Sequence, residues 1–568
     1  RSARLQGHAL PQTVFNQTHL AEAERMLANV AIEHYDNICE RIGTLASCER
    51  MQACSTPIPG PFADTRDMSD EFKQADAAEI EGLLRQHKAV IEVPLLQAQM
   101  ENAKIYQGLM IRNIKADGRH KSRYAVDGSK MKCDKTQSPT LMAPSLRSIC
   151  AICAKHDMVM ACGDFTMAYL NAALPPSDRY YVYPPRGARQ YDSDGNRIVW
   201  WVVKALYGGP DSGLRWYTEL RKWFINQDYV ASEADPCVFV KWNAEKTKRV
   251  SIVGVYVDDL VMGCDNEDTL NALIAALKKD FMFNVTTTEY LSVQIEQTKG
   301  YVQLSMPRYI EAMRDDVPPC DTAVHVPVAD DIAALVLQAM DSDGASVSAA
   351  ERKAYGTIVG KLLYVALLVR PDVAYAVGML ARALSKPTAA LLGAAHRVVH
   401  YLLQTKMLGL RYSKASRGGL HGMADADWSV RRSTSGYCFF YAGTVISYMS
   451  KRQPTIALSS TEAEIMAASL AALEVVYLAA LLQEAGEPEQ TPVDLFTDNS
   501  GAEALANNYV SNSRTRHIER RHLKIRELVE RGFVAAKWIA TDDNTADIFT
   551  KALGRRKFEK FRRQLLNM

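Results

Sequence analysis

The pattern of apolar and polar residues predicts alternating helices and strands in the first half of the chain. Apolar residues recur at helical spacing over 69–88, which predicts a helix there. Strand-like segments then alternate with turns through IRNIKADGRHKSRYAVDG. A helix is expected over 145–155, followed by the short apolar strand MVMACGDF, and VWWVVK predicts a further strand.

A β-hairpin with two aspartates at its tip is the clearest local pattern. Two apolar, β-branched segments, 251–257 and 260–264, flank Asp258 and Asp259 in SIVGVYVDDLVMGC. Two adjacent carboxylates repel each other unless a cation lies beside them, so the tip is a candidate metal site. A solvated turn is the alternative, because aspartate is common in turns.

The second half of the chain begins with helices over 350–410 and changes to strands from 419. A long helix is expected from 460 to about 485, capped by Ser460 or Thr461. Its apolar part, 465–482, carries Ser469 and Glu474, which predicts a buried helix of a soluble protein and no membrane span. The final strands and helices, with a last helix from 545, predict an α/β domain with a mixed sheet.

Composition excludes several classes of protein. The 568 residues are 48% hydrophobic and 23% charged, which predicts several globular domains and excludes a disordered, collagenous or coiled-coil chain. The net charge is only +2, so any positive surface for nucleic acid must be local.

The start of the sequence and its cysteines bear on processing and compartment. The first residues, RSARLQGHALPQ, contain no apolar run and no Met, and we expect a piece cut from a longer chain without a secretory signal. The eleven cysteines suit a reducing compartment, and we expect Cys150 and Cys153 to pack on one helix face.

Four acidic residues lie where elements of the last domain end or begin: Asp425, Glu464, Asp498 and Asp547. Carboxylates that converge at one edge of a sheet can hold two Mg²⁺ ions for phosphodiester cleavage. Each carboxylate by itself has a simpler explanation as a helix cap or a surface charge. Their neighbours Asp427 and Glu462 are close enough in sequence to be confused with the ligands, and we expect Glu462 to act only at the helix terminus.

Ordered motifs identify the chain as similar to copia-type (Pseudoviridae) LTR-retrotransposon Pol polyproteins, from about residue 68 to 553. ADADWSVRRSTSGYCFFYAGTVISYMSKRQPTIALSSTEAEIMAAS and NTADIFTKAL resemble the ribonuclease H region of that family. GDFTMAYLNAALP, VKALYGG, YVDDL and YGTIVGKLLYVALLVRPDVAYAVGML resemble its reverse transcriptase and connection regions.

The resemblance implies a multidomain α/β and α+β chain, with a right-hand polymerase of fingers, palm and thumb, a helical connection and a C-terminal ribonuclease H-like domain. The expected boundaries are an N-terminal tail or linker over 1–65, fingers and palm over 66–315, thumb and connection over 316–415, and ribonuclease H with a basic tail over 416–568. Segment 511–568 holds 15 Lys or Arg against 7 Asp or Glu, which suits a hybrid backbone or a solvated tail. His517 and His522 match a family pattern, and we assign them no chemistry.

The same resemblance implies roles for individual residues. Asp164, Asp258 and Asp259 match the palm carboxylates that bind two Mg²⁺ ions, with Mn²⁺ as the alternative. Asp425, Glu464, Asp498 and Asp547 match the ribonuclease H metal ligands. Lys121 and Arg123 match the residues that hold the triphosphate of the incoming dNTP, with an exposed strand face as the alternative. Tyr169 matches the aromatic residue under its sugar, with a core tyrosine as the alternative.

The implied function is RNA-directed DNA synthesis followed by degradation of the RNA strand of the RNA–DNA hybrid. The implied partners are an RNA template, a DNA or tRNA primer, the hybrid and dNTPs, with self-association or other Pol segments in addition. We expect no membrane, and a cytoplasmic virus-like particle with nuclear entry. One departure favours a weakened, nucleic-acid-binding relic or a structural subunit: Pro210 and Asp211 replace the Lys-Gln of the family, and an acid there would oppose a triphosphate.

Overall fold

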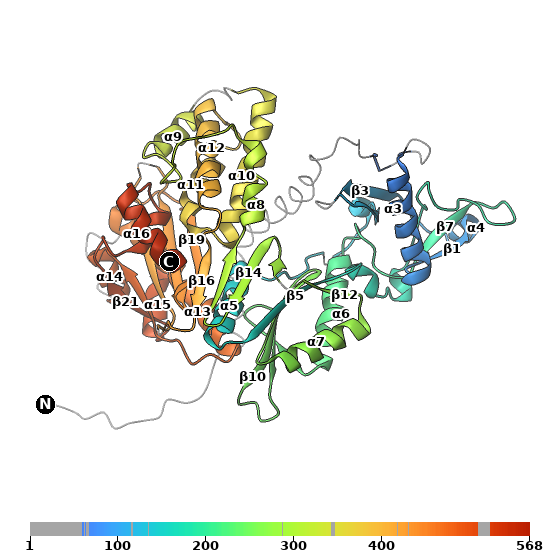
Figure 1. Ribbon diagram of the computed structural model, residues 1–568, viewed down its shortest axis with the longest axis horizontal. Coiled ribbons are helices and arrows are strands. Elements are labelled where there is room, and N and C mark those ends of the chain that lie inside the picture. Colours follow the sequence, from blue (N-terminus) through green and yellow to red (C-terminus); the bar gives the residue numbers. More distant parts are fainter. Residues whose placement is uncertain are drawn as a thin grey trace.

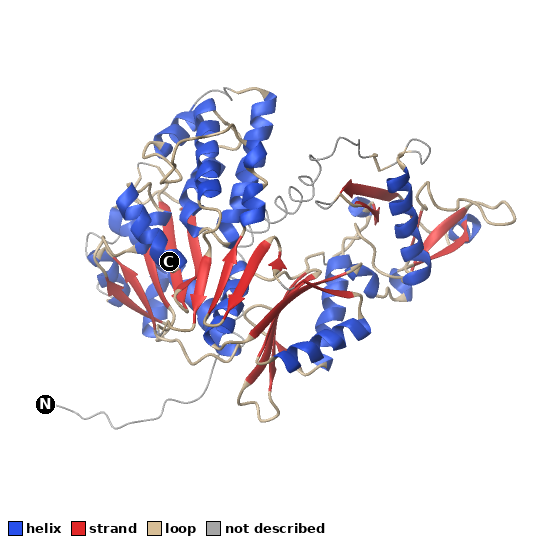
Figure 2. Ribbon diagram, viewed as in Figure 1, coloured by secondary structure: helices blue, strands red, loops and turns tan. Residues whose placement is uncertain are grey.

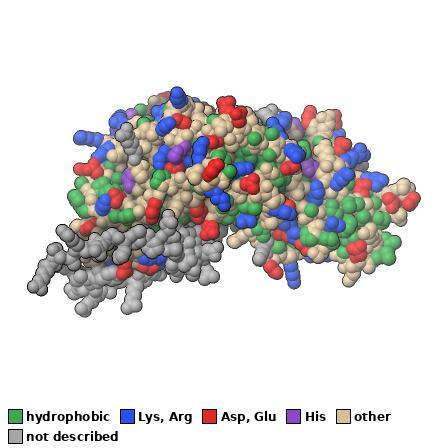
Figure 3. All heavy atoms as spheres, turned by 90° about the horizontal axis from the view of Figure 1, so that it is seen from below, with side chains coloured by type: hydrophobic (Ala, Val, Ile, Leu, Met, Phe, Trp, Pro, Cys, Tyr) green, Lys and Arg blue, Asp and Glu red, His purple; other side chains and the backbone are tan. Residues whose placement is uncertain are grey.

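The computed structural model describes residues 59–61, 63, 68–114, 118–134, 136–286, 288–341, 347–416, 418–429, 431–508 and 523–568. Nearly all of the expected tail 1–65 therefore lies outside the described residues, as do His517, His522 and the first part of the basic segment. Two bodies lie side by side, one built around the C-terminal sheet and helices α9–α12, the other around the sheets of the N-terminal half (Figures 1 and 2). Lys and Arg are interspersed with Asp and Glu on the face in Figure 3, as the low net charge predicts.

The N-terminal region holds a helix, a hairpin and a small sheet. Helix α3 (Asp70–Glu81) packs on the hairpin of β3 (Gly108–Ile114) and β4 (His120–Val126), where the buried Arg112 and Asp76 form an ion pair at 2.6 Å. The helix and the strands predicted here are confirmed. The sheet beside them has the order β1-β7-β6-β2, with β1 (Val90–Pro94), β7 (Ile198–Val202), β6 (Tyr180–Val182) and β2 (Ile105–Tyr106).

A six-stranded antiparallel sheet follows, with helices on both faces. Its order is β12-β5-β11-β10-β9-β8, and its strands are β12 (Phe283–Thr286), β5 (Val159–Phe165), β11 (Asp259–Cys264), β10 (Arg249–Tyr256), β9 (Val238–Trp242) and β8 (Tyr229–Ala231). Helices α6 (Ser212–Asn226) and α7 (Glu267–Asp280) cover one face. Helix α5 (Ala143–Lys155) covers the other, where Cys150 and Cys153 are buried and unbridged, as predicted.

A helical unit and a small sheet connect this region to the C-terminal domain. The helices are α8 (Pro307–Glu311), α9 (Ile332–Asp341), α10 (Ala349–Leu368), α11 (Ala374–Arg382) and α12 (Ala389–Gln404), and the antiparallel sheet comprises β13 (Glu289–Tyr290), β14 (Val293–Thr298), β15 (Tyr301–Ser305) and β16 (Leu410–Ser413). The helices predicted over 350–410 are confirmed. Ser348 caps the N-terminus of α10. Its hydroxyl accepts from the N–H of Glu351, and the Glu351 carboxylate accepts from the N–H of Ser348, so that two otherwise free backbone N–H groups are satisfied.

The C-terminal domain contains the predicted mixed sheet, in the order β19-β18-β17-β20-β21. The strands are β17 (His421–Ala426), β18 (Thr434–Tyr441), β19 (Thr444–Arg452), β20 (Val493–Thr497) and β21 (Val534–Trp538). The first three pair antiparallel, whereas β17–β20 and β20–β21 pair parallel. Helices α13 (Ser460–Glu484), α14 (Ser500–Asn507), α15 (Lys524–Glu530) and α16 (Arg555–Leu566) complete the domain.

Two helix boundaries differ from the prediction. Helix α13 is capped by Ser459, whose hydroxyl accepts from the N–H of Glu462, and not by Ser460 or Thr461. No single helix begins at Thr545: a 3₁₀ turn, η11 (Thr545–Phe549), is separated from α16 by a non-helical segment that ends at Gly554, whose ψ of 150° is extended. Among the described residues α13 alone has the length and apolarity to cross a membrane, and 89% of its most apolar window is buried inside the protein.

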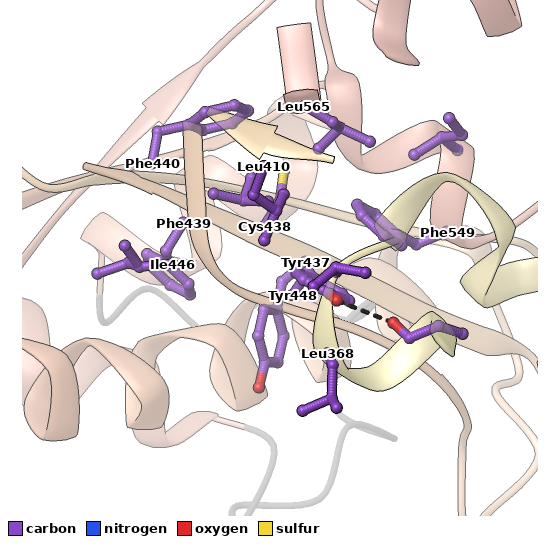
Figure 4. Close-up of a cluster of buried hydrophobic side chains, with 14 of the residues drawn as sticks. Leu368, Leu410, Tyr437, Cys438, Phe439, Phe440, Ile446, Tyr448, Phe549 and Leu565 are labelled. Carbon is purple, nitrogen blue, oxygen red and sulfur yellow. Dashed lines mark hydrogen bonds between the residues drawn. The ribbon is translucent and has the colours of Figure 1, made fainter. Parts of the chain in front are cut away.

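One continuous core joins helix α5 to the C-terminal domain. Figure 4 shows part of it, where Leu410, Cys438, Phe549 and Leu565 gather from four different elements. The Tyr448 hydroxyl donates to the backbone carbonyls of Ala366 and Leu367 at the end of α10. The sheet of the C-terminal domain is therefore held directly by the helical unit and by α5.

A buried carboxylate, Glu487, fastens the six-stranded sheet region to the C-terminal domain. Its side chain is fully buried and accepts from Lys155 at 2.9 Å, His156 at 2.8 Å, Arg249 at 3.1 Å and the Tyr441 hydroxyl at 2.6 Å. Despite burial, these donors hold the pKa of Glu487 well below its usual range. The carboxylate is therefore ionised and compensated across the interface.

Glu487→Ala is expected to lower the stability of the chain by about 3 kcal/mol, because it leaves the buried Arg249 guanidinium without its carboxylate partner and removes the hydrogen bond from the buried Tyr441 hydroxyl. Thermal unfolding monitored by circular dichroism measures the shift. The matched control is Glu489→Ala, since Glu489 is exposed and contacts only the Thr491 hydroxyl among the hydrogen bonds of the described residues. Equal unfolding temperatures for both variants would contradict an interface role for Glu487.

Two candidate carboxylate sites

The first site lies at the ends of β5 and β11 in the six-stranded sheet. The antiparallel register places Asp259 directly opposite Asp164. Asp258 occupies the turn before β11, and its carbonyl accepts from the N–H of Phe165 at 2.8 Å. The predicted hairpin is confirmed, and it places Asp259 opposite Asp164 on adjacent strands, with Asp258 in the adjoining turn.

The turn before Asp258 is held in an unusual conformation. Val257 has φ of 54°, a left-handed value that a β-branched residue rarely adopts. Its carbonyl accepts from the indole N–H of Trp216 on α6 at 2.7 Å. This contact fixes the backbone immediately before the two aspartates.

The charges of Lys121 and Arg123, on β4, act on the first site. Burial raises the pKa of Asp258, the nearby Asp164 raises it further, and Arg123 and Lys121 oppose the rise. A carboxylate is thus partly desolvated beside a second acid, which is the situation that a bound cation relieves. The structure brings the predicted cations of the hairpin to the predicted aspartates of the sheet.

Tyr169 lies beside this site and is also packed. Its ring is 5.0 Å from that of Tyr207, over which the Arg123 guanidinium lies at 4.9 Å. Burial raises the pKa of Tyr169, and the charge of Asp258 raises it further. Tyr169 therefore contributes both to the packing beneath the site and to the wall next to Asp258. Sequence reasoning missed Tyr207, for which LYGG offered no chemical signal.

The acid in the unusual loop is paired. Asp211 accepts from Arg215 Nε at 2.5 Å, and Arg215 also forms an ion pair with Asp178 at 2.5 Å. All three side chains are partly exposed. Arg215, in the first turn of α6, therefore compensates part of the negative charge at Asp211 and shares its own charge with Asp178, and the effect of this loop on a triphosphate stays a prediction.

The second site lies where β17, β20 and α13 meet. One carboxylate oxygen from each of Asp425, Glu464 and Asp498 lies within 4.8 Å of the others. Parallel pairing of β17 with β20 brings the carboxyl ends of these strands to one edge, and α13 crosses beside them. Within the described ranges no other three acidic, His or Cys side chains meet this criterion, and the first site does not.

The electrostatics of the second site favour a cation. Burial and the charges of Asp425 and Asp498 raise the pKa of Glu464 to about 10. Burial also raises the pKa of Asp425 to about 7. The charges of Asp547 and Asp498 add to this rise, and the charge of Lys551 opposes it. The buried Glu464 Oε2 has no hydrogen-bond partner. Three carboxylates in close proximity, one of which has an oxygen without a hydrogen-bond partner, suit Mg²⁺, because this ion binds oxygen ligands.

Asp547 lies beside this cluster and not within it. Its carboxylate forms ion pairs with Lys551 at 2.7 Å and Lys557 at 2.5 Å. Lys551 Nζ is also 3.8 Å from Asp425 Oδ2. The structure thus brings three of the four predicted acids together and shows a lysine that sequence reasoning missed, although its i, i+4 spacing from Asp547 was a usable signal.

The two neighbouring acids have backbone partners. Glu462 accepts from the N–H of Leu458 at 2.6 Å, ahead of the first turn of α13. Asp427 accepts from the N–H of Thr434 across the β17–β18 loop. Both side chains therefore stabilise local backbone, and neither belongs to the three-carboxylate cluster.

Comparison with known proteins defines the class first. A family model described as "Reverse transcriptase (RNA-dependent DNA polymerase)" matches residues 89–328, which include the first site with Lys121, Arg123 and Tyr169. The chain thus contains a reverse transcriptase domain. The second site lies beyond the matched residues.

Relatives then identify the family. The chain is 30% identical over 476 residues to the retrovirus-related Pol polyprotein from transposon TNT 1-94 of Nicotiana tabacum, covering 78% of this chain and 34% of the relative. It is 30% identical over 434 residues to that from transposon RE1 of Arabidopsis thaliana, covering 75% and 28%. The chain belongs to the family of copia-type retrotransposon Pol polyproteins, and it spans about a third of the length of these relatives.

A solved structure of foamy viral protease-reverse transcriptase in complex with RNA/DNA hybrid is also similar. It has a TM-score of 0.47 at 11% identity, with 94% of this chain and 65% of that chain covered. At this level the likeness carries no information about individual residues.

Proposed function

We propose that this chain is an RNA-directed DNA polymerase that copies RNA into DNA by two-metal nucleotidyl transfer. The observation that carries the proposal is the placement of Asp259 opposite Asp164, with Asp258 in the adjoining turn. The charge of Arg123 also acts on the Asp258 carboxylate and lowers its pKa. The reverse transcriptase family match over these residues supports it. In this assignment the helix-backed hairpin β3–β4 is part of the fingers, the six-stranded sheet is the palm, and α9–α12 form the thumb and connection.

The aspartates would hold two Mg²⁺ ions, which supply positive charge for attack of the primer 3′-hydroxyl on the dNTP. Lys121 and Arg123 bind the triphosphate, because two cations near the aspartates compensate its charge. The Tyr169 ring lies under the sugar and excludes a 2′-hydroxyl. The fixed turn at Val257 keeps Asp258 in place, so that little reorganisation is needed when substrates bind.

We propose a second activity, cleavage of the RNA strand of RNA–DNA hybrids, for the C-terminal domain as a ribonuclease H. Asp425, Glu464 and Asp498 would hold Mg²⁺, with Mn²⁺ as the alternative ion. Lys551 and Asp547 border the cluster and adjust its charge. The orphaned Glu464 oxygen and the mutual repulsion of the carboxylates support this proposal.

The remaining parts of the proposal follow from these two activities. The partners are an RNA template, a DNA or tRNA primer, dNTPs and the hybrid product, with self-association or other Pol segments in addition, and the location is a cytoplasmic virus-like particle with nuclear entry. A catalytically weakened relic or a structural subunit is the competing function. The Asp211–Arg215 pair reduces the negative charge on which the argument for weakening rests, although Arg215 is shared with Asp178.

The decisive test of both activities uses the purified chain with poly(rA)/oligo(dT), dTTP and Mg²⁺. Extension of the primer followed by shortening of the RNA strand supports the proposal. Binding of the template-primer without extension in either Mg²⁺ or Mn²⁺ would favour the relic.

Tyr169→Val is expected to increase ribonucleotide incorporation relative to deoxyribonucleotide by about tenfold or more, because the clash with the 2′-hydroxyl is relieved. Single-nucleotide incorporation with each nucleotide gives the ratio of kcat/KM values. Tyr191→Val is the control, since Tyr191 is an exposed tyrosine in the loop before β7. Unchanged discrimination would restrict Tyr169 to packing.

A further inference from the structure

Two lysines lie against the two oxygens of the buried Asp547 carboxylate. Lys551 Nζ is 2.7 Å from Asp547 Oδ1, and Lys557 Nζ is 2.5 Å from Asp547 Oδ2. The Asp547 side chain is fully buried, so solvent does not compensate its charge. Asp547 therefore offers no oxygen to a metal ion unless one of the two lysines moves away.

The two lysines are held in different ways. Lys557 donates a hydrogen bond to Asp547 Oδ2. Asp547 Oδ1 accepts no hydrogen bond, so Lys551 is held beside it by charge alone. The Lys551 side chain is 43% exposed and that of Lys557 is 28% exposed. Lys551 is therefore the lysine that moves into solvent more easily, because a contact by charge alone has little directional preference.

Lys551 also reaches the carboxylate cluster. Its Nζ is 3.8 Å from Asp425 Oδ2 at the end of β17. The hydroxyl of Thr550, one residue earlier, donates to the same oxygen of Asp425. The Lys551 ammonium therefore lies between Asp425, which belongs to the cluster, and Asp547, which lies beside it.

The charge of Lys551 acts on the carboxylates of the cluster. Burial raises the pKa of Glu464 and of Asp425, and the charge of Lys551 opposes both rises. One monovalent cation thus already compensates part of the negative charge of the site. A divalent ion bound to both Asp425 and Asp547 would need the position of this ammonium, because two cations at such short range repel each other.

We propose that Lys551 is an internal counter-ion in the place of a second divalent ion between Asp425 and Asp547, and that it moves away before such an ion binds. The proposal rests on the ribonuclease site proposed above, in which the three-carboxylate cluster holds the first ion. The first ion then binds without competition, whereas the second has to displace a cation. Lys551 thereby sets the affinity for the second ion and keeps Asp425 and Asp547 compensated until that ion arrives.

The test counts Mn²⁺ ions bound to the full chain, by electron paramagnetic resonance of the Mn²⁺ that stays free. Lys551→Gln removes the ammonium and keeps a polar side chain. The Mn²⁺ concentration at which the second ion binds is expected to fall about tenfold or more in this variant, because no cation has to be displaced. Ions at the aspartates of the first site are common to both chains and cancel in the comparison.

Lys557→Gln is the matched control for this test. It removes a cation from the same carboxylate, and within the described ranges the ion pairs of Lys557 are with Asp542 and Asp547 and not with Asp425. Lys557→Gln and the charge-conserving Lys551→Arg should both bind Mn²⁺ like the wild type. An unchanged binding curve for Lys551→Gln, or an equal gain in Lys557→Gln, would overturn the proposal.

Thermal unfolding gives a second readout, which a purely structural lysine would not move in the same way. In EDTA, Lys551→Gln is expected to unfold at a lower temperature than the wild type, because Asp425 and Asp547 lose a cation. Mn²⁺ is expected to raise the unfolding temperature of Lys551→Gln more than that of the wild type, because an additional ion binds the folded state. Equal rises in the two chains would count against a counter-ion role.

Hybrid cleavage separates this inference from the proposed function. If the wild type cleaves the hybrid and Lys551→Gln binds Mn²⁺ no better than the wild type, only the counter-ion role is wrong. If the wild type leaves the hybrid intact and Glu464→Gln binds as many Mn²⁺ ions as the wild type, the ribonuclease site is wrong and the counter-ion role with it.

Discussion

Asp258→Asn is expected to abolish primer extension, by at least about a thousandfold, and to leave hybrid cleavage largely intact. The substitution keeps the size of the side chain but removes a charge that the proposed metal ions require. Asp258 is partly desolvated next to Asp164, so the neutral side chain costs little packing and relieves repulsion. The turn itself is held by backbone contacts at Val257 and Asp258, which the substitution leaves in place.

The measurement is dTTP incorporation on poly(rA)/oligo(dT), with cleavage of a preformed hybrid followed in parallel. Asp268→Asn on the exposed first turn of α7 is the matched control and should retain both activities. Loss of both activities in a folded Asp258→Asn protein would show that the two sites are not separate.

Glu464→Gln should eliminate Mg²⁺-dependent hybrid cleavage while primer extension continues, and Glu462→Gln should not. Two residues on a helix point about 200° apart, so the two carboxylates cannot face the same ions. Glu464 belongs to the cluster with Asp425 and Asp498, whereas Glu462 accepts from the backbone of Leu458. Glu462→Gln therefore costs at most about 1 kcal/mol of stability, the usual value of one capping interaction.

A stability measurement complements the activity assay. In EDTA at neutral pH, Glu464→Gln is expected to unfold at a temperature close to that of the wild type, because the raised pKa of about 10 leaves Glu464 protonated without a metal and the amide replaces a neutral acid. Cleavage lost in Glu462→Gln and retained in Glu464→Gln would mean that α13 presents the other face to the substrate.

Much of the first site follows from local sequence. The β-branched segments on both sides of Asp258 and Asp259 predict the hairpin without reference to the rest of the chain, and the apolar strand ending at Asp164 is equally local. Their side-by-side placement is a property of the sheet, because the register of β5 against β11 is set by burial on both faces. The cations of β4 and the ring of Tyr207 reach the site only through the placement of the β3–β4 hairpin beside the six-stranded sheet.

The C-terminal domain shows the same division between local and tertiary causes. The pattern of residues determined its mixed order of strands and helices, the buried character of α13 and the acids at element ends, since each depends on periodicity or on turn chemistry within a few residues. The tertiary structure alone decided which acids meet: Asp547 is drawn to Lys551 and Lys557, and Glu464 is left with Asp425 and Asp498. Ion pairs and desolvation depend on distances between segments far apart in the chain, and a sequence pattern does not specify these distances.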